Sequence, residues 1–271
     1  MLAQTQKPVD RVEVDYRPPT LLVEAKVNGK GPFWFAFDTG ASTSLIDAKV
    51  AERLKLKPEQ RPDREGPYFT RARTLAVGRA QARDLELVIR DFAPLSARVG
   101  REVAGIVGYN WMEQFVFEID YRALRMTFWP STVELTPRAN QFPVPLELRS
   151  VRGLTGAVLY IPARMEAKHR CPAEIDTGTD LGIIGRQMAL QLGVDVNRLG
   201  GQRERSRYDV RRLDLAGRTY VNVPFYIDPR RGADANPYAQ CILGNEVLKE
   251  FVLTIDIARR RAFFERLLPL P

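Results

Sequence analysis

The chain has 271 residues, a length that suits two ordinary domains better than one. Its composition, 45% hydrophobic and 27% charged, is typical of a globular protein and excludes a disordered or fibrous one. The net charge of +8 could attract nucleic acid, but the basic residues are scattered and not interleaved with aromatic residues, so we expect no nucleic-acid partner. No apolar run approaches the roughly 18 to 20 residues of a membrane-spanning helix, so we expect no transmembrane segment.

The first half of the chain is predicted to be mainly strands with short helices. Residues 21–27 and 33–37 are β-rich runs around a turn sequence and predict a hairpin. Asp47 is placed to cap a short helix, and Asn110, with Glu113 three residues later, resembles the cap of a second one. Further strands are predicted over residues 85–89, 115–120 and 125–129, and in the second half over residues 223–227.

The second half repeats the first. The sequence 36–40, Ala-Phe-Asp-Thr-Gly, is matched 138 positions later by 174–178, Glu-Ile-Asp-Thr-Gly. At an offset of 136, residues 105–108 match 241–244, and residues 115–120 match 251–256. Two copies of one unit therefore make up the chain. The apolar residues of the closing segments are expected to form core, namely Trp111, Phe115, Phe117 and Ile119 with their counterparts Val247, Phe251, Leu253 and Ile255.

Four prolines within residues 130–145 mark the expected link between the copies, because proline blocks helices and central strands alike. We place the boundary near residue 140. This division predicts an N-terminal lobe of residues 1–140 and a C-terminal lobe of residues 141–271.

Few kinds of catalytic chemistry remain open to this composition. A single histidine and two cysteines cannot build a usual zinc site, and no Gly-x-Ser-x-Gly elbow supports a nucleophilic serine. Neither a dinucleotide fingerprint nor a phosphate-binding loop is present, so we expect no metal and no cofactor. Carboxylates are left, and Asp38 and Asp176 stand at equivalent ends of apolar strands, each before Thr-Gly.

With these two Asp-Thr-Gly motifs, each followed about 70 residues later by an apolar pair and glycine, the chain resembles the aspartic peptidases, pepsin-like and retroviral. It looks like a retropepsin-type dimer fused into one polypeptide, and bacterial retropepsin-like proteases are the closest group. The resemblance implies a mainly β fold of two barrel lobes related by a pseudo-twofold axis, with short helices. It also implies an endopeptidase acting on proteins or peptides as a monomer.

The resemblance further assigns roles to residues of the two loops. Asp38 and Asp176 would be the catalytic pair, Thr39 and Thr177 would brace the loops through their hydroxyls, and Gly40 and Gly178 would line the cleft floor. Thr179 lies three residues after Asp176, where Ala41 stands in the first copy. In pepsin-like enzymes a hydroxyl at this position donates to its own aspartate, so we expect Asp176 to be the base and Asp38 to hold the proton.

Two flaps are also implied by the resemblance. The candidate segments are residues 64–73, with Gly66 at the tip and Tyr68 as an aromatic lid, and residues 199–209, with Gly200, Gly201 and Tyr208. Plain surface loops are the alternative for both segments, because neither has the glycine-rich pattern of retroviral flaps.

Several alternatives stay open. The chain could be a catalytically idle module that binds or inhibits with the same two-lobed cleft, although idle copies usually lose an aspartate. A glycosidase also uses paired carboxylates but does not require Asp-Thr-Gly twice. A periplasmic or secreted location is expected from the similarity of residues 2–5 to a signal-peptidase site, with the cytoplasm as the alternative. Cys171 and Cys241 are either bridged or, as we expect, buried free thiols.

Overall fold

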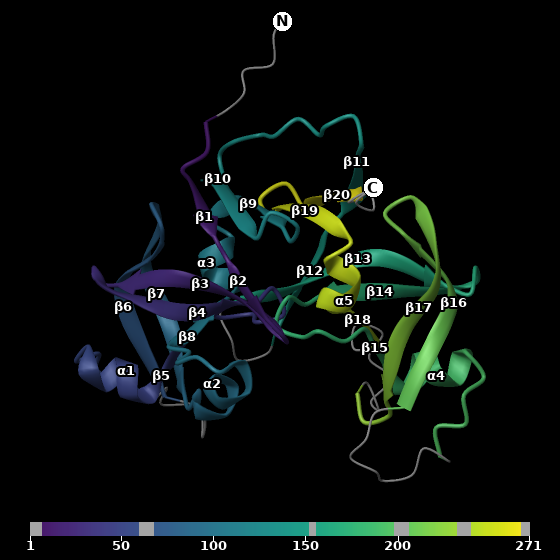
Figure 1. Ribbon diagram of the computed structural model, residues 1–271, viewed down its shortest axis with the longest axis horizontal. Coiled ribbons are helices and arrows are strands. Elements are labelled where there is room, and N and C mark those ends of the chain that lie inside the picture. Colours follow the sequence, from purple (N-terminus) through teal and green to yellow (C-terminus); the bar gives the residue numbers. More distant parts are fainter. Residues whose placement is uncertain (1–6, 60–67, 152–155, 198–205, 232–239, 267–271) are drawn as a thin grey trace, which may run out of the picture.

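The computed structural model describes residues 7–59, 68–151, 156–197, 206–231 and 240–266. Of these residues 54% are in strands and 12% in helices, and the strands form two closed six-stranded barrels. The barrels lie on either side of a third sheet, seen at the top of Figure 1. The predicted mainly β fold of two lobes is thus confirmed.

The first barrel uses only strands from before residue 140. Its sheet has the order β2-β3-β4-β8-β5-β7-β6, and a further pairing of β3 with β6 closes six of these strands into the barrel, with β2 added beside β3. The predicted hairpin over residues 21–37 is confirmed as β3 and β4. The strands are β2 (Asp15–Arg17), β3 (Thr20–Val27), β4 (Lys30–Phe37), β5 (Leu45–Asp47), β6 (Phe69–Val77), β7 (Ala80–Arg90) and β8 (Gly105–Val107).

The second barrel repeats this topology with strands from after residue 140. Its order is β12-β13-β14-β18-β15-β17-β16, and β13 pairs with β16 to close it. The strands are β12 (Glu147–Ser150), β13 (Ala157–Met165), β14 (His169–Ile175), β15 (Ile183–Gly185), β16 (Ser206–Leu215), β17 (Arg218–Asp228) and β18 (Cys241–Leu243).

The third sheet takes three strands from each half, in the order β1-β10-β9-β19-β20-β11. The predicted link is shorter than residues 130–145, because Pro143 and Pro145 lie within β11. That strand is at the sheet edge and pairs only with β20, so the missing proline N–H groups cost no ladder bond. The strands are β1 (Asp10–Glu13), β9 (Phe115–Asp120), β10 (Arg125–Pro130), β11 (Gln141–Pro145), β19 (Phe251–Asp256) and β20 (Arg261–Arg266).

The described helices are short. They are α1 (Ala48–Arg53), α2 (Ala93–Val99), α3 (Tyr109–Met112), α4 (Arg186–Gln191) and α5 (Asn245–Leu248). Among the described residues, no helix has the length and apolar character needed to cross a membrane.

One of the two predicted helix caps is confirmed. The Asp47 carboxylate accepts hydrogen bonds from the N–H groups of Lys49 and Val50 at the start of α1. The Asn110 cap was wrong: α3 is capped by Gly108, and the Asn110 side chain accepts hydrogen bonds from the N–H and hydroxyl of Ser44. The Asn110 side chain therefore bonds to Ser44, a distant residue in the sequence, and not to the start of α3 as the local pattern predicted.

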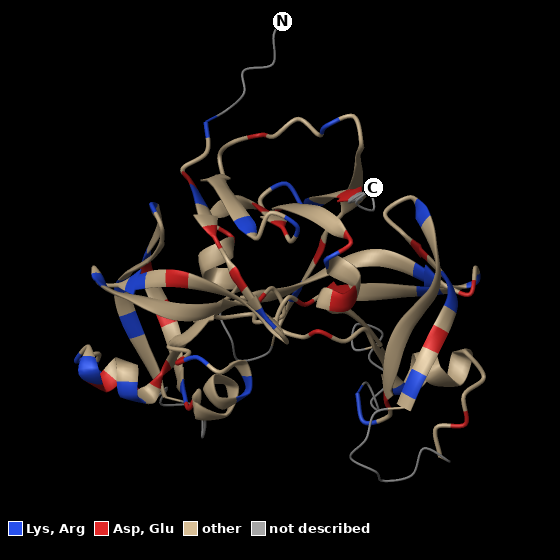
Figure 2. Cartoon of the chain, viewed as in Figure 1, with Lys and Arg blue, Asp and Glu red and all other residues tan. Residues whose placement is uncertain are grey.

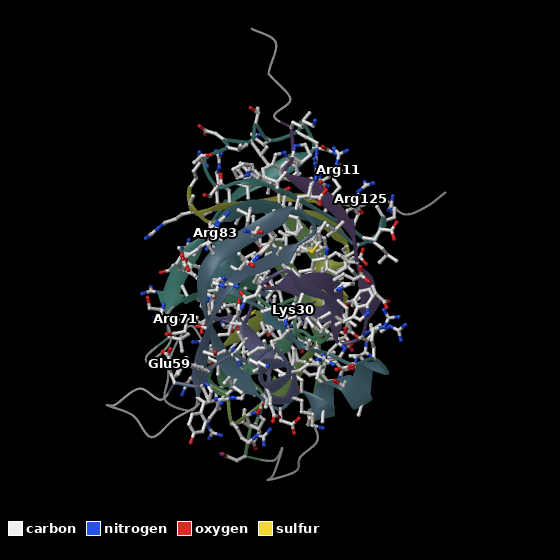
Figure 3. The ribbon with its side chains drawn as sticks, turned by 90° about the vertical axis from the view of Figure 1, so that its left-hand side faces the viewer. Arg11, Lys30, Glu59, Arg71, Arg83 and Arg125 are labelled. Atoms are coloured by element: carbon white, nitrogen blue, oxygen red, sulfur yellow. The ribbon has the colours of Figure 1, made fainter. Side chains whose placement is uncertain are left out.

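The predicted core of the closing segments is confirmed, since all eight residues named for it are buried. The Trp111 and Phe115 rings lie 4.5 Å apart, and Phe128 packs edge-on against Trp111 at 5.4 Å. Lys and Arg are spread over both lobes among Asp and Glu (Figure 2), and on the outer side of the first lobe Lys30, Arg71 and Arg83 lie well apart (Figure 3).

Candidate active site

Asp38 and Asp176 each follow the strand that leads into the centre of the molecule, β4 in the first lobe and β14 in the second. A short strand holds each of them in place. The Asp38 N–H donates to the Val107 carbonyl of β8 and the Asp176 N–H donates to the Leu243 carbonyl of β18, both at 3.1 Å. The apolar-apolar-Gly segments thus support the two loops in the same way.

The two loops are joined by a symmetric set of hydrogen bonds between Thr39 and Thr177. Each hydroxyl accepts a bond from the opposite threonine N–H at 3.1 Å. Each hydroxyl also donates across the interface at 2.7 Å, from Thr39 to the Ile175 carbonyl and from Thr177 to the Phe37 carbonyl. Both threonines are buried, so these bonds are shielded from water and fix the loops against each other.

Gly40 and Gly178 let the carboxyl groups approach. A Cβ on Gly40 would lie 2.7 Å from Cγ of Asp176, and one on Gly178 would lie 2.5 Å from Cγ of Asp38. Any larger residue would therefore collide with the aspartate of the other lobe. The N–H of each glycine also donates at 2.8 Å to the aspartate of its own loop.

The two carboxyl groups are hydrogen-bonded to each other and differ in their surroundings. Burial and the neighbouring Asp176 carboxylate raise the pKa of Asp38 well above its usual value. Burial also raises the pKa of Asp176, but the N–H groups of Gly178 and Thr179, the Asp38 carboxyl and the Arg231 guanidinium oppose this rise. Two carboxyls so close hold one proton between them, and the environment favours keeping it on Asp38.

Thr179 contributes through a different atom from the one expected. Its backbone N–H bonds to Asp176, whereas its hydroxyl makes no hydrogen bond to Asp176 in the described part of the chain. In the first lobe the Ala41 N–H donates to the Asp38 backbone carbonyl at 3.2 Å. The prediction of a hydroxyl donor was therefore wrong, and the assignment of the proton to Asp38 and of the base to Asp176 stays a prediction.

The flap candidates are placed only in part. Gly66, Gly200 and Gly201 lie outside the described residues. Tyr68 is 55% exposed and lines a pocket of about 530 Å³ together with α1 residues. Tyr208 is half-buried in β16 and packs against the core.

Other supporting residues were not recognised in the sequence. Asn245 of α5 donates to the Thr177 carbonyl at 3.0 Å and to the Pro19 carbonyl at 2.8 Å, and it accepts a bond from the Tyr121 hydroxyl at 2.6 Å. It therefore ties the second loop to two segments of the first half. In the sequence, its position directly after the Ile-Leu-Gly segment could have marked Asn245 as a supporting residue of the site.

The two cysteines are free and buried. Cys171 on β14 and Cys241 on β18 are close enough for their thiols to be hydrogen-bonded, and this contact, followed by burial, raises the pKa of Cys241. The expectation of free thiols is confirmed.

Two barrel lobes that meet at paired, cross-braced Asp-Thr-Gly loops are the arrangement that the resemblance to the aspartic peptidases implied. Residues 23–111 match the protein family described as aspartyl protease, a span that contains Asp38-Thr39-Gly40 and the supporting strand β8. The predicted resemblance is thereby confirmed, and the two lobes fit a fused retropepsin-like protein. No curated protein sequence matches the chain.

Proposed function

We propose that this protein is an aspartic endopeptidase that hydrolyses peptide bonds in proteins or peptides with Asp38 and Asp176. The observation that carries this proposal is the opposition of the two carboxyl groups, each placed against the glycine of the other lobe. Such a pair offers one acid and one base to the same water molecule.

The reaction needs only the two carboxyl groups and water. Asp176, ionised, takes a proton from the water as its oxygen attacks the carbonyl carbon, while Asp38 gives its proton to the carbonyl oxygen. The C–N bond of the tetrahedral intermediate then breaks: Asp176 gives its newly acquired proton to the leaving nitrogen, and a hydroxyl of the intermediate returns a proton to Asp38 as the carbonyl re-forms. The second carboxyl group is needed throughout, because a single carboxyl cannot be the base for the water and the acid for the carbonyl oxygen in the same step.

Both loops belong to one chain, which supports the further proposal that the monomer is active. The cross-lobe threonine bonds and the shared sheet complete the site without a second copy.

The proposal is tested with casein and a peptide library between acidic and neutral pH. Asp38→Asn and Asp176→Asn should each lose almost all cleavage, because each leaves a single ionisable group. Asp84→Asn is the matched control: this residue is exposed at a positive φ of 52°, which asparagine tolerates, and cleavage should be unchanged. Substantial cleavage by either dyad variant would contradict the assignment.

The idle-module alternative has a different outcome in the same assay. Binding of peptides or of a statine inhibitor, with no cleavage at any pH, would favour a binding module over an enzyme.

A further inference from the structure

A polar cluster lies beside Asp176 in the second lobe. Glu174 on β14 is buried, with 8% of its side chain exposed, and forms an ion pair with Arg231, which follows β17. The Tyr160 hydroxyl on β13 donates to the same Glu174 carboxylate at 3.4 Å. We call Tyr160, Glu174 and Arg231 the polar triad.

The corresponding place in the first lobe is apolar. Tyr160 and Glu174 are directly opposite each other on β13 and β14, as Leu22 and Ala36 are on β3 and β4. Leu22 and Ala36 belong to a small buried apolar cluster with Phe92, which lies two residues beyond β7, whereas Arg231 lies three residues beyond β17. The paired strands are equivalent in the two lobes, but this place is apolar in the first lobe and charged in the second. Removing two charges from water costs free energy, and only the second lobe has this pair. We therefore expect the pair to have a role.

The triad is close to the reacting groups. Glu174 precedes Asp176 by two residues, and alternate residues of an extended strand face the same side. The Arg231 guanidinium lowers the pKa of Asp176, and the Glu174 carboxylate raises the pKa of Asp38. Among the described residues, Arg149 of β12 also acts on Tyr160, and the buried Cys241 thiol of β18 interacts with Glu174 and Arg231.

We propose that the polar triad positions the single proton of the dyad on Asp38 and keeps Asp176 ionised, and so widens the pH range in which the site is competent. This inference rests on the proposed peptidase function and adds three residues to its machinery. Tyr160, Glu174 and Arg231 are positioning residues, since they act through the aspartates and not on the substrate.

The two charged members act on opposite ends of that pH range. The positive Arg231 favours the anion on Asp176, so the dyad loses its first proton at lower pH. The negative Glu174, once ionised, opposes a second negative charge, so the dyad keeps its last proton to higher pH. The opposite charges of Arg231 and Glu174 therefore move the two ionisations of the dyad further apart in pH. Apolar residues at this place in both lobes would leave the two ionisations closer together in pH.

The test compares pH profiles of peptide cleavage. Arg231→Gln should move the acidic limb up by about one pH unit, because an opposite charge near a carboxyl shifts its pKa by about 1 to 3 units. Arg231→Lys keeps the charge and should restore most of the wild-type limb. Glu174→Gln should move the basic limb down. The triple variant Tyr160→Leu, Glu174→Ala and Arg231→Gln gives β13 and β14 the apolar pair of the first lobe and removes the Arg231 charge, so its profile should be narrowed at both ends.

A second readout does not depend on cleavage. Carboxyl ¹³C NMR titrations, with the dyad signals identified from Asp38→Asn and Asp176→Asn, should show the first ionisation moved up in Arg231→Gln and restored in Arg231→Lys. If the NMR signals shift in this way but the protein cleaves no peptide, the effect of the triad on the dyad would be supported and the proposed peptidase function would be wrong. An active enzyme whose limbs and dyad signals are the same in Arg231→Gln as in the wild type would overturn the triad alone.

Discussion

Thr254 and Glu118 face each other at the centre of the third sheet, where the Thr254 hydroxyl donates to the Glu118 carboxylate at 3.2 Å. The two residues are 136 positions apart, which is the offset of the internal repeat in this part of the chain. A residue can lie opposite its own equivalent only on the axis that relates the copies. The pseudo-twofold axis therefore passes between β9 and β19, and continuous backbone hydrogen bonding holds the two lobes in one orientation.

The cross-lobe threonine bonds should be required for both stability and cleavage. Thr39→Val keeps the shape of the side chain but removes a donor and an acceptor, which leaves the Ile175 carbonyl and the Thr177 N–H buried without their partner. We expect a loss of about 1 to 3 kcal/mol in the free energy of unfolding for each orphaned group, measured by urea denaturation. Thr39→Ser retains the hydroxyl and should recover most of this loss. Equal stability of the valine and serine variants would argue against the bracing role.

Enlarging either loop glycine should disable the dyad with little effect on the rest of the fold. In Gly178→Ala the new methyl group would displace the Asp38 carboxyl, and in Gly40→Ala it would displace Asp176. We expect cleavage and statine binding to fall together in both variants, with far-UV circular dichroism unchanged. Full activity of Gly178→Ala would show that the Asp38 carboxyl does not need its observed position.

The aromatic cluster below the first loop should contribute strongly to stability. Phe115 packs against Trp111 and Phe128 and is 7% exposed. Phe115→Ala should cost roughly 3 to 5 kcal/mol, the usual range for a buried aromatic residue, and lower the melting temperature accordingly. Val221→Ala, at a residue that is 69% exposed, is the control and should leave that temperature nearly unchanged. A stable Phe115→Ala variant would place the residue outside the core.

Glu174 should make the protein less stable as the pH rises. Burial raises its pKa from an ordinary value of 4.5 to about 7, although Arg231 and Tyr160 partly oppose this shift. Between pH 4.5 and pH 7 the unfolded chain releases the Glu174 proton and the folded chain retains it. The contribution of Glu174 to the free energy of unfolding therefore falls from pH 4.5 to pH 7 and is constant above pH 7. The difference amounts to roughly 3 kcal/mol.

Glu174→Gln should abolish this part of the pH dependence, because an amide does not titrate. Urea unfolding at pH 4 and pH 8 measures the effect, and the wild type should lose stability relative to the variant on going to pH 8. Glu24→Gln, at an exposed position of β3, should show no such change. A constant difference between wild type and Glu174→Gln at both pH values would mean that folding does not change the pKa of Glu174.

Features that depend on neighbouring residues or on the repeat were available from the sequence alone. The Asp47 cap involves only the next three residues, and the two Asp-Thr-Gly loops with their supporting strands recur at a nearly constant offset. Duplication identified the pair of aspartates, since one copy of the motif would have been an ordinary strand end. The division near residue 140 stays a prediction, because the sheet that joins β9 to β19 is shared between the halves.

Only the tertiary structure decided which partners the polar side chains take. Asn110 was expected at a helix end but bonds to Ser44, 66 residues away. In the sequence Glu174 stands between Ala173 and Ile175 with no sign of its partners. The barrel brings it to Tyr160, 14 residues earlier, and to Arg231, 57 residues later. Apolar burial follows a periodic pattern along the chain, so it can be read locally. A hydrogen bond or ion pair is directional and joins single atoms, so it exists only after the barrels close and bring distant strands together.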